Sequence, residues 1–215
     1  MLHPGKTERK ENEEFMETKL QWQDGKTRCA WANPKNERYI RYHDEEWGVP
    51  VYEDGKLFEM LILETFQAGL SWECVLNKRD AFRLAFDGFD PEKVKAYQEE
   101  KIDRLLSDPG IIRNGRKIRA AVKNAEVFCG IQREFGSFCA YLWGFTDGKV
   151  LVERGRSSSP LSDALSKDLK KRGMSFVGTT VMYAYLQAVG VINSHEEDCF
   201  LSGPAVRFTD RKAGL

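Results

Sequence analysis

The segment DGKLFEMLILETFQAGLSW (residues 54–72) gives the clearest indication of the fold. Its first half predicts an apolar helix, because large apolar side chains recur there at helical spacing: Leu57, Phe58, Leu61 and Ile62. We expect Asp54 to cap this helix and Ser71 to cap the next one, which places Trp72 in the first turn of the second helix. The segment therefore predicts consecutive helices, and the rest of the chain extends that pattern.

Signals elsewhere in the chain are also mostly helical. Asp90-Pro91-Glu92 supplies a cap, a proline suited to the first helical position and an acid for the first turn. Further helices are expected over three segments: residues 115–135, from Ser162 or Asp163 to the basic residues before Gly173, and residues 179–189. The best strand signal is the segment 149–153. The sequence predicts an all-α fold, or one close to it, without internal repeats.

Composition limits the class of protein. The 215 residues carry a formal net charge of zero, so no bulk positive field points to a nucleic-acid partner. Positive charge is instead grouped locally, and either of two groups could be an ordinary solvated helix face: Arg113, Arg116, Lys117 and Arg119, and Lys167, Lys170, Lys171 and Arg172. The apolar runs are too short to span a membrane, and five cysteines without a secretion signal indicate a reduced, cytoplasmic protein.

We expect one domain, or two interlocked subdomains, between two loose ends. Residues 1–27 are dense in Lys, Glu, Asn and Gln and have little apolar periodicity, which is typical of a flexible extension. Residues 201–215 are expected to form a loose C-terminal tail. The folded domain is therefore placed at residues 28–200.

Flat side chains gather around one acid in the N-terminal part of this domain: Trp31, Tyr39, Tyr42, Trp47 and Trp72, with Glu64 among them. Aromatic faces attract planar and cationic ligands, and stacking on a nucleobase is worth about 1–3 kcal/mol per base. Each tryptophan taken singly is more often a core residue. The clustering of several rings favours a pocket for a planar ligand.

Glu64 is the acid that the helix pattern places on an apolar surface. Leu57, Leu61 and Glu64 are spaced by four and three residues, whereas Glu59 falls on the more polar side. A carboxyl group that faces a core is costly unless it is paired or functional, and desolvation raises its pKa. The alternative is that the helix frays at residues 67–69 and leaves Glu64 in solvent. The nearby aromatic residues favour a functional role for this acid.

Four residues from opposite ends of the domain could bind a metal ion. His195 and Cys199 are four residues apart, one helical turn, and residues 194–197 (Ser-x-x-Glu) have the pattern of a capping box that starts a helix. Cys29 and His43 could complete a Cys₂His₂ set, which is typical of a closed structural zinc site. A buried histidine and buried thiols without a metal are the alternative. A metal here would join the start of the fold to its end.

These residues belong to longer motifs that resemble the bacterial DNA-3-methyladenine glycosylase I family, which are small all-α enzymes of the helix-hairpin-helix glycosylase superfamily. The matching stretches span about residues 28–200: Cys29-Ala30-Trp31, Tyr39-x-x-Tyr42-His43-Asp44-Glu45-Glu46-Trp47-Gly48, Leu63-Glu64-x-x-Gln67-Ala68-Gly69-Leu70-Ser71-Trp72, Gly110-Ile111-Ile112-Arg113, residues 161–167 and 176–180, and His195-x-x-x-Cys199. The strings YHDEEWG (residues 42–48) and QAGLSW (residues 67–72) are long enough to be specific.

The resemblance implies base-excision repair of alkylated double-stranded DNA. The enzyme would flip a 3-methyladenine nucleotide out of the duplex and hydrolyse its N-glycosidic bond, releasing the free base and leaving an abasic site. Glu64 would be the pocket carboxylate, and in its ionised form it would attract the cationic base. Tyr42 and Trp72 would stack on that base. The pocket wall is assigned to the remaining aromatic residues: Trp31, Tyr39 and Trp47.

The same resemblance implies a metal site and the contacts to DNA. One structural Zn²⁺ is assigned to four ligands: Cys29, His43, His195 and Cys199. The loop that fills the gap left in the duplex is assigned to Gln67, Gly69 and Leu70, with simple packing as the alternative for Leu70. The hairpin, at about residues 162–189, would contact phosphates through Lys167, Gly178 and Thr179. We expect the enzyme to act as a monomer.

The sequence departs from the superfamily pattern at several positions. Asn193 stands where many members carry an aspartate for the hydrolytic step, and Thr180 stands where bifunctional members carry a Schiff-base lysine, so no lyase activity is expected. The first turn glycine of the hairpin is also replaced, leaving Phe176-Val177-Gly178. Two rival functions remain open: a zinc-stabilised module that binds DNA lesions without cleaving them, and a small-molecule hydrolase that uses Glu64 with His43. A preference for 3-methylguanine is a variation on the main interpretation.

Overall fold

A computed structural model describes Trp22 and residues 24–203; most of the predicted N-terminal extension and of the C-terminal tail lies outside the described residues. Within that part of the chain the secondary structure is almost wholly helical, as predicted. Its elements are α1 (Glu37–Glu45), α2 (Asp54–Gln67), α3 (Trp72–Asn77), α4 (Arg79–Ala85), the 3-10 helix η1 (Asp87–Phe89), α5 (Pro91–Val94), α6 (Glu99–Ser107), α7 (Gly115–Phe135), α8 (Phe138–Gly144), β1 (Leu151–Val152), α9 (Pro160–Lys171), α10 (Thr179–Ala188) and β2 (Ile192–Asn193).

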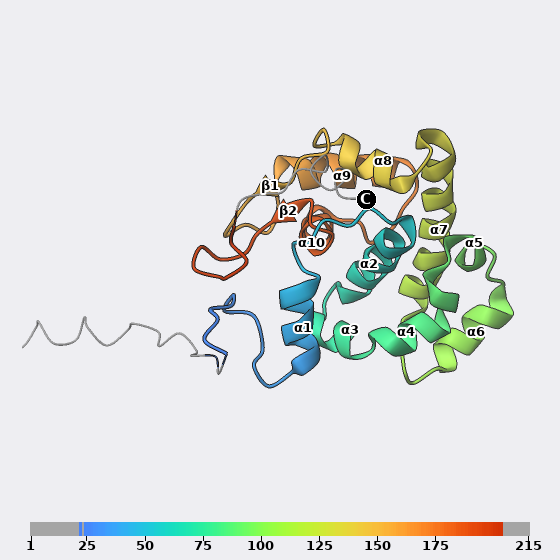
Figure 1. The fold of residues 1–215 in the computed structure, drawn as a ribbon. Coiled ribbons are helices and arrows are strands. Elements are labelled where there is room, and N and C mark those ends of the chain that lie inside the picture. The colour runs from blue at the N-terminus through green and yellow to red at the C-terminus, as the bar shows by residue number, and fades with distance from the viewer. Residues whose placement is uncertain (1–21, 23, 204–215) are drawn as a thin grey trace, which may run out of the picture.

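Helix α2 forms the centre of the molecule. In Figure 1 it lies between α1, α3 and α4 below and α8 and α9 above, and it contacts α3, α7, α8 and α10. Every residue from Leu57 to Phe66 is buried, so this part of the helix has no side exposed to solvent. Glu59, predicted to fall on the more polar side, does face charged side chains although it is buried: its carboxylate pairs with Arg79 at 2.8 Å and Arg83 at 2.7 Å. Glu64 lies on the same buried helix.

Asp54 does not cap its own helix, contrary to the sequence prediction. It is the first residue of α2, whose N-cap is Glu53. Its carboxylate instead accepts hydrogen bonds from the backbone amides of Phe138 and Cys139, both at 2.8 Å, at the start of α8. Gln132 donates a third hydrogen bond to it at 2.7 Å. The acid thus satisfies the free amides of a helix more than 80 residues away, which local sequence cannot reveal.

Other predicted helix ends agree with the structure. Ser71 caps α3 by accepting from the amide of Cys74 at 3.2 Å, and Trp72 begins that helix. Asp90 caps α5, whose first residue is Pro91. The long helix predicted over residues 115–135 is α7 with the same bounds.

The start of α9 lies earlier than predicted. Ser159 is its N-cap and Pro160 its first residue, while Ser162 is the third residue of a capping box, with its hydroxyl accepting from the amide of Ser159 at 2.8 Å. The helix ends at Lys171, before the left-handed Gly173, as expected. A short loop then leads into α10, so that α9 and α10 pack against each other as a helical hairpin.

The C-terminal end of α10 is tied to the loop that follows α1. Gly190 has φ +70°, and a Cβ atom there would lie 2.2 Å from the backbone carbon of Val49, so only glycine fits this approach. Backbone hydrogen bonds from Gly48 to Gln187 at 2.9 Å and from Val51 to Val189 at 3.0 Å fix the contact. A two-residue parallel pairing of β1 with β2 then directs the chain past residue 193. These contacts bring the two ends of the domain together.

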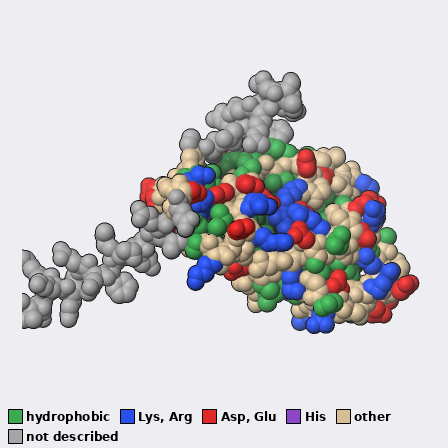
Figure 2. All heavy atoms as spheres, turned by 60° about the horizontal axis from the view of Figure 1, so that its bottom comes forward, with side chains coloured by type: hydrophobic (Ala, Val, Ile, Leu, Met, Phe, Trp, Pro, Cys, Tyr) green, Lys and Arg blue, Asp and Glu red, His purple; other side chains and the backbone are tan. Residues whose placement is uncertain are grey.

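The surface carries both signs of charge, in accord with the zero net charge. On the face shown in Figure 2, Lys and Arg side chains lie among Asp and Glu side chains. None of the helices in the described part of the chain is long and apolar enough to cross a membrane.

Candidate functional site

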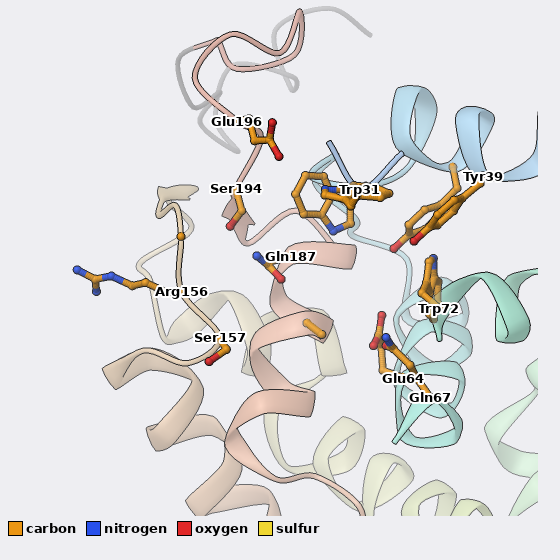
Figure 3. A pocket seen from close by; sticks show the side chains of 14 residues that line it. Trp31, Tyr39, Glu64, Gln67, Trp72, Arg156, Ser157, Gln187, Ser194 and Glu196 are labelled. Carbon is orange, nitrogen blue, oxygen red and sulfur yellow. The ribbon is translucent and has the colours of Figure 1, made fainter. Parts of the chain in front are cut away.

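A pocket of about 590 Å³ opens between the N-terminal aromatic residues, α2, and the far side formed by α10 and the segments around β1 and β2 (Figure 3). It is lined by Trp31, Tyr39, Tyr42, Trp47, Glu64, Gln67, Trp72, Gly155, Arg156, Ser157, Ala184, Gln187, Ser194 and Glu196. All five aromatic residues singled out from the sequence therefore meet Glu64 in one cavity. Its size is in the range of small-molecule sites.

One wall of the pocket is aromatic. Helix α1 supplies Tyr39 and Tyr42 from successive turns, and Tyr42 lies against Trp72 with ring centroids 5.1 Å apart. Trp31 contacts Trp47 edge to face at 4.8 Å and Tyr39 at 5.4 Å. Because the rings pack on one another, their orientations are set before a ligand arrives. The indole Nε1 of Trp72 is buried without a hydrogen-bond partner, so it is a donor that a ligand in the pocket can use.

Glu64 is the buried acid of the pocket. Helix α2 continues through Glu64 to Gln67, so the alternative in which a frayed end leaves Glu64 in solvent is wrong. The side chain is only 3% exposed, its Oε2 has no hydrogen-bond partner, and burial raises the pKa of the carboxyl to about 8. The group is therefore mostly neutral at pH 7 in the free protein. A cationic or hydrogen-bond-donating ligand would favour its ionised form.

The wall opposite the aromatic residues was not foreseen from the sequence. Gln187 and Ser194 lie across the cavity from Trp72 and Glu64, and Arg156 and Ser157 form part of its rim (Figure 3). These residues are more than 80 positions from Glu64 and have no pattern that marks a site. In the sequence, their position in or beside the predicted hairpin or next to His195 was the signal that could have indicated them.

Cys29, His43, His195 and Cys199 come together as predicted, and they could hold a metal ion. All four are buried, and their ligand atoms lie within 4.8 Å of one another. Nδ1 of His195 is 3.5 Å from both thiol Sγ atoms, and Nε2 of His43 is 3.6 Å from Sγ of Cys199. A tetrahedral ion with bonds of about 2.0–2.3 Å separates its ligands by roughly 3.3–3.8 Å, and the separations of 3.5 and 3.6 Å fall within that range.

Neighbouring groups orient the two histidines. Nδ1 of His43 is hydrogen-bonded to Asp44 at 2.8 Å, and Nε2 of His195 lies 3.1 Å from the carbonyl of Trp47. Partners of this kind hold a histidine in the tautomer that binds a metal. Burial also lowers the pKa of His195 to about 4, which keeps the imidazole neutral. Trp47, 4.6 Å from the His195 ring, links this cluster to the pocket.

The segment from Ser194 to Cys199 is not a helix, so the predicted capping box does not form. The hydroxyl of Ser194 is buried without a partner, and the chain makes a turn in which Cys199 donates to the carbonyl of Glu196 at 2.9 Å. The turn still places His195 and Cys199 on the same side. The spacing of four residues therefore predicted correctly that His195 and Cys199 lie together, although the segment is a turn and not the expected helix.

The loop after α2 is held by a buried lysine. Nζ of Lys117 donates to the carbonyls of Phe66 at 2.8 Å and Ala68 at 2.6 Å. Lys117 is thus not part of a solvated helix face, so that interpretation of the basic group at residues 113–119 is wrong for this residue. Beyond it, Gly69 has φ +81° and Leu70 is 41% exposed, which disfavours the alternative of core packing for Leu70. Gln67 lines the pocket itself.

The start of α10 faces the start of α9. Gly178 is the N-cap of α10, and the Thr179 hydroxyl donates to Asp163 at 2.6 Å and lies 2.8 Å from the Ser162 hydroxyl. The Thr179 side chain is therefore engaged, which leaves the backbone amides of this helix end for a ligand. Phe176 has φ +59°, a conformation that glycine adopts more readily, at the position where a turn glycine is replaced.

The two basic groups of the sequence meet beside this hairpin turn. A hollow of about 710 Å³ is lined by Arg116, Arg119, Lys123 and Lys170 together with residues 174–178. Arg119 pairs with Glu99, and Lys123 pairs with Glu126 at 2.7 Å. Arg116 and Lys170 form no ion pair among the described residues. Lys167 is exposed on the same helix as Lys170.

A helical fold with an aromatic pocket around a buried acid, next to a helical hairpin, is the arrangement of a base-excising DNA glycosylase. Residues 31–202 match the methyladenine glycosylase family, and the chain belongs to that family. It is 46% identical over 178 residues to DNA-3-methyladenine glycosylase 1 of Escherichia coli (strain K12), covering 80% of this chain and 95% of that protein.

Solved structures agree with this assignment. A crystal structure of 3-methyladenine DNA glycosylase I superimposes with a TM-score of 0.79 at 45% identity, covering 82% of this chain and 100% of that one. The Staphylococcus aureus 3-methyladenine DNA glycosylase I, solved to explain 3-methyladenine recognition, gives a TM-score of 0.78 at 36% identity, covering 82% and 96%.

Proposed function

We propose that this protein excises 3-methyladenine from alkylated double-stranded DNA by hydrolysing the N-glycosidic bond. The observation that carries the proposal is the buried Glu64 carboxyl, whose Oε2 lacks a partner inside an aromatic cavity. A buried acid without a partner is costly unless a ligand supplies one. Family membership supports the same activity.

The chemistry of the base explains why this pocket suffices. Methylation at N3 leaves adenine positively charged, so the base departs with the bonding electron pair as neutral 3-methyladenine and needs no protonation. Water adds to the sugar carbon, loses a proton and leaves an abasic site. Stacking against Tyr42 and Trp72 favours the cation by roughly 0.5–2 kcal/mol. Glu64, ionised beside the cation, accepts from the exocyclic amine, whereas uncharged adenine gains less from both contacts.

We assign DNA binding to the α9–α10 hairpin, acting as a helix-hairpin-helix element. Backbone amides at Gly178 and Thr179 offer a phosphate site, since helix N-termini attract anions. Lys167 supplies further positive charge on α9. Residues Gln67, Gly69 and Leu70 would occupy the space that the flipped nucleotide leaves, and the exposure of Leu70 supports this role.

We propose that Cys29, His43, His195 and Cys199 hold one structural Zn²⁺. The ion would close a tetrahedral site without an open position and would stabilise the joined ends of the domain. This assignment disfavours the hydrolase alternative, in which Glu64 acts with His43, because His43 lies in the cluster and not among the pocket-lining residues. The alternative of a silent lesion-binding module needs neither Glu64 nor the aromatic wall. We place the enzyme in the cytoplasm as a monomer without lyase activity.

Release of free bases from N-methylated duplex DNA, resolved by chromatography, tests the proposal. Zinc-loaded protein should release 3-methyladenine and leave 7-methylguanine in the DNA. Folded protein that releases no base would reduce the function to binding alone. Equal release of both bases would contradict a pocket selective for 3-methyladenine.

A further inference from the structure

The rim of the pocket contains one segment whose role the base-binding scheme leaves open. Gly155, Arg156 and Ser157 lie between β1 and α9, are exposed, and line the cavity opposite the aromatic wall. Arg156 is exposed, and its guanidinium points away from the cavity (Figure 3). Among the described residues it forms no ion pair or hydrogen bond. Arg156 is therefore placed to contact something outside the pocket and not the base inside it.

The charges of the residues that line the pocket set Arg156 apart. The protein has no net charge. Two of the residues that line the pocket are acids, Glu64 and Glu196. Arg156 is the residue among those lining the pocket that carries a positive charge. A DNA strand brings a negative phosphate on each side of a flipped nucleotide. Among the residues that line the pocket, Arg156 is therefore the side chain that can attract such a phosphate.

The rim also continues into the hairpin. Residues after Ser157 lead directly to Ser159, which caps α9, and the Ser162 hydroxyl is 2.8 Å from the hydroxyl of Thr179 at the start of α10. The pocket mouth and the amides assigned to phosphate binding are thus joined by one short segment. Asp163 accepts a hydrogen bond from the Thr179 hydroxyl at 2.6 Å, so the hairpin end of this segment carries a negative side chain, whereas Arg156 carries a positive one at the pocket end.

We propose that Arg156 binds the phosphate next to the flipped nucleotide, with the Ser157 hydroxyl as a second donor. This inference rests on the proposed function and adds a positioning residue to it. Arginine suits the task because its planar guanidinium can donate two parallel hydrogen bonds to a phosphate. The contact would hold the nucleotide in its extruded position while Glu64 and the aromatic wall hold the base.

The test compares DNA with the free base. Arg156→Ala should lower kcat/KM for 3-methyladenine release from duplex DNA about tenfold at low salt, and should reduce the slope of log affinity against log salt by about one. Affinity for free 3-methyladenine should stay unchanged, because the guanidinium lies outside the cavity. Arg156→Lys should retain part of the DNA effect. Arg133→Ala, which removes another exposed positive charge, from α7, is the matched control and should leave the release rate unchanged.

The outcomes separate the two proposals. Arg156→Ala protein that acts on DNA like Arg133→Ala, while wild-type protein releases 3-methyladenine, would overturn the role of Arg156 and leave the proposed function intact. An equal loss of affinity for the free base would also overturn it, since that result places Arg156 at the base. Wild-type protein that releases no base would remove the proposed function and this inference with it.

Discussion

Replacing Glu64 with glutamine should stabilise the folded protein at neutral pH. Burial raises the pKa of this carboxyl from 4.5 to about 8, so the folded state keeps a proton that the unfolded state has released. The free energy of unfolding contributed by this group is therefore highest below pH 4.5 and falls as the pH rises towards 8. The glutamine side chain has nearly the same shape and does not titrate, so the variant lacks this loss.

The size of the effect follows from the two pKa values. A shift from 4.5 to about 8 costs the wild type roughly 3 kcal/mol between pH 5 and pH 8. Urea unfolding of both proteins at several pH values in this range measures it, because the difference between the two curves isolates Glu64 from other titrating groups. Glu100→Gln is the control, since the Glu100 side chain is 88% exposed.

The stability difference between Glu64→Gln and wild type should grow with pH, while the Glu100→Gln difference should stay nearly constant. A Glu64→Gln difference that does not change with pH would mean that the carboxyl titrates as it does in water. The pocket would then be hydrated, and the argument for an acid poised to receive a cation would fail.

Three further predictions concern the supports of the site. His195→Ala should lower zinc content and the unfolding temperature together, measured by metal analysis and calorimetry; a full equivalent of zinc in the variant would refute the ligand set. Lys117→Met should lower the free energy of unfolding by about 2 kcal/mol, because the carbonyls of Phe66 and Ala68 lose their charged donor; unchanged stability in urea would contradict this. Borohydride should not trap the protein on DNA, because Thr180 cannot form a Schiff base; a trapped adduct would disprove monofunctional hydrolysis.

The sequence predicted the elements whose signals are local. The bounds of α7 and the cap at Ser71 depend on periodicity and on groups within a few residues, and both agree with the structure. The aromatic cluster was equally accessible, because most of its members lie within two neighbouring helices. The family motifs then gave the expected partners for Cys29 and His43.

Features that depend on distant contacts were not predictable in the same way. Asp54 has the pattern of a local cap, yet it serves the amides of α8. The sequence suggests that Lys117 lies on the surface, but its side chain is buried against the end of α2. The wall formed by Gln187 and Ser194 comes from chain segments that meet α2 only after the fold has formed. In each case the partner lies many residues away, and periodicity carries no information about it.

The most direct test of the central claim is a titration of wild-type and Glu64→Gln protein with free 3-methyladenine. Quenching of the tryptophan fluorescence reports the occupancy of the aromatic pocket, and adenine serves as the control ligand. Saturable binding of 3-methyladenine by the wild type, at least tenfold tighter than by folded Glu64→Gln protein, is the predicted result. The difference arises because the protonated Glu64 carboxyl can pass its proton to the neutral base and then pair with the cation that forms. Equal affinity of the two proteins for 3-methyladenine would contradict the role of Glu64 in recognising the base.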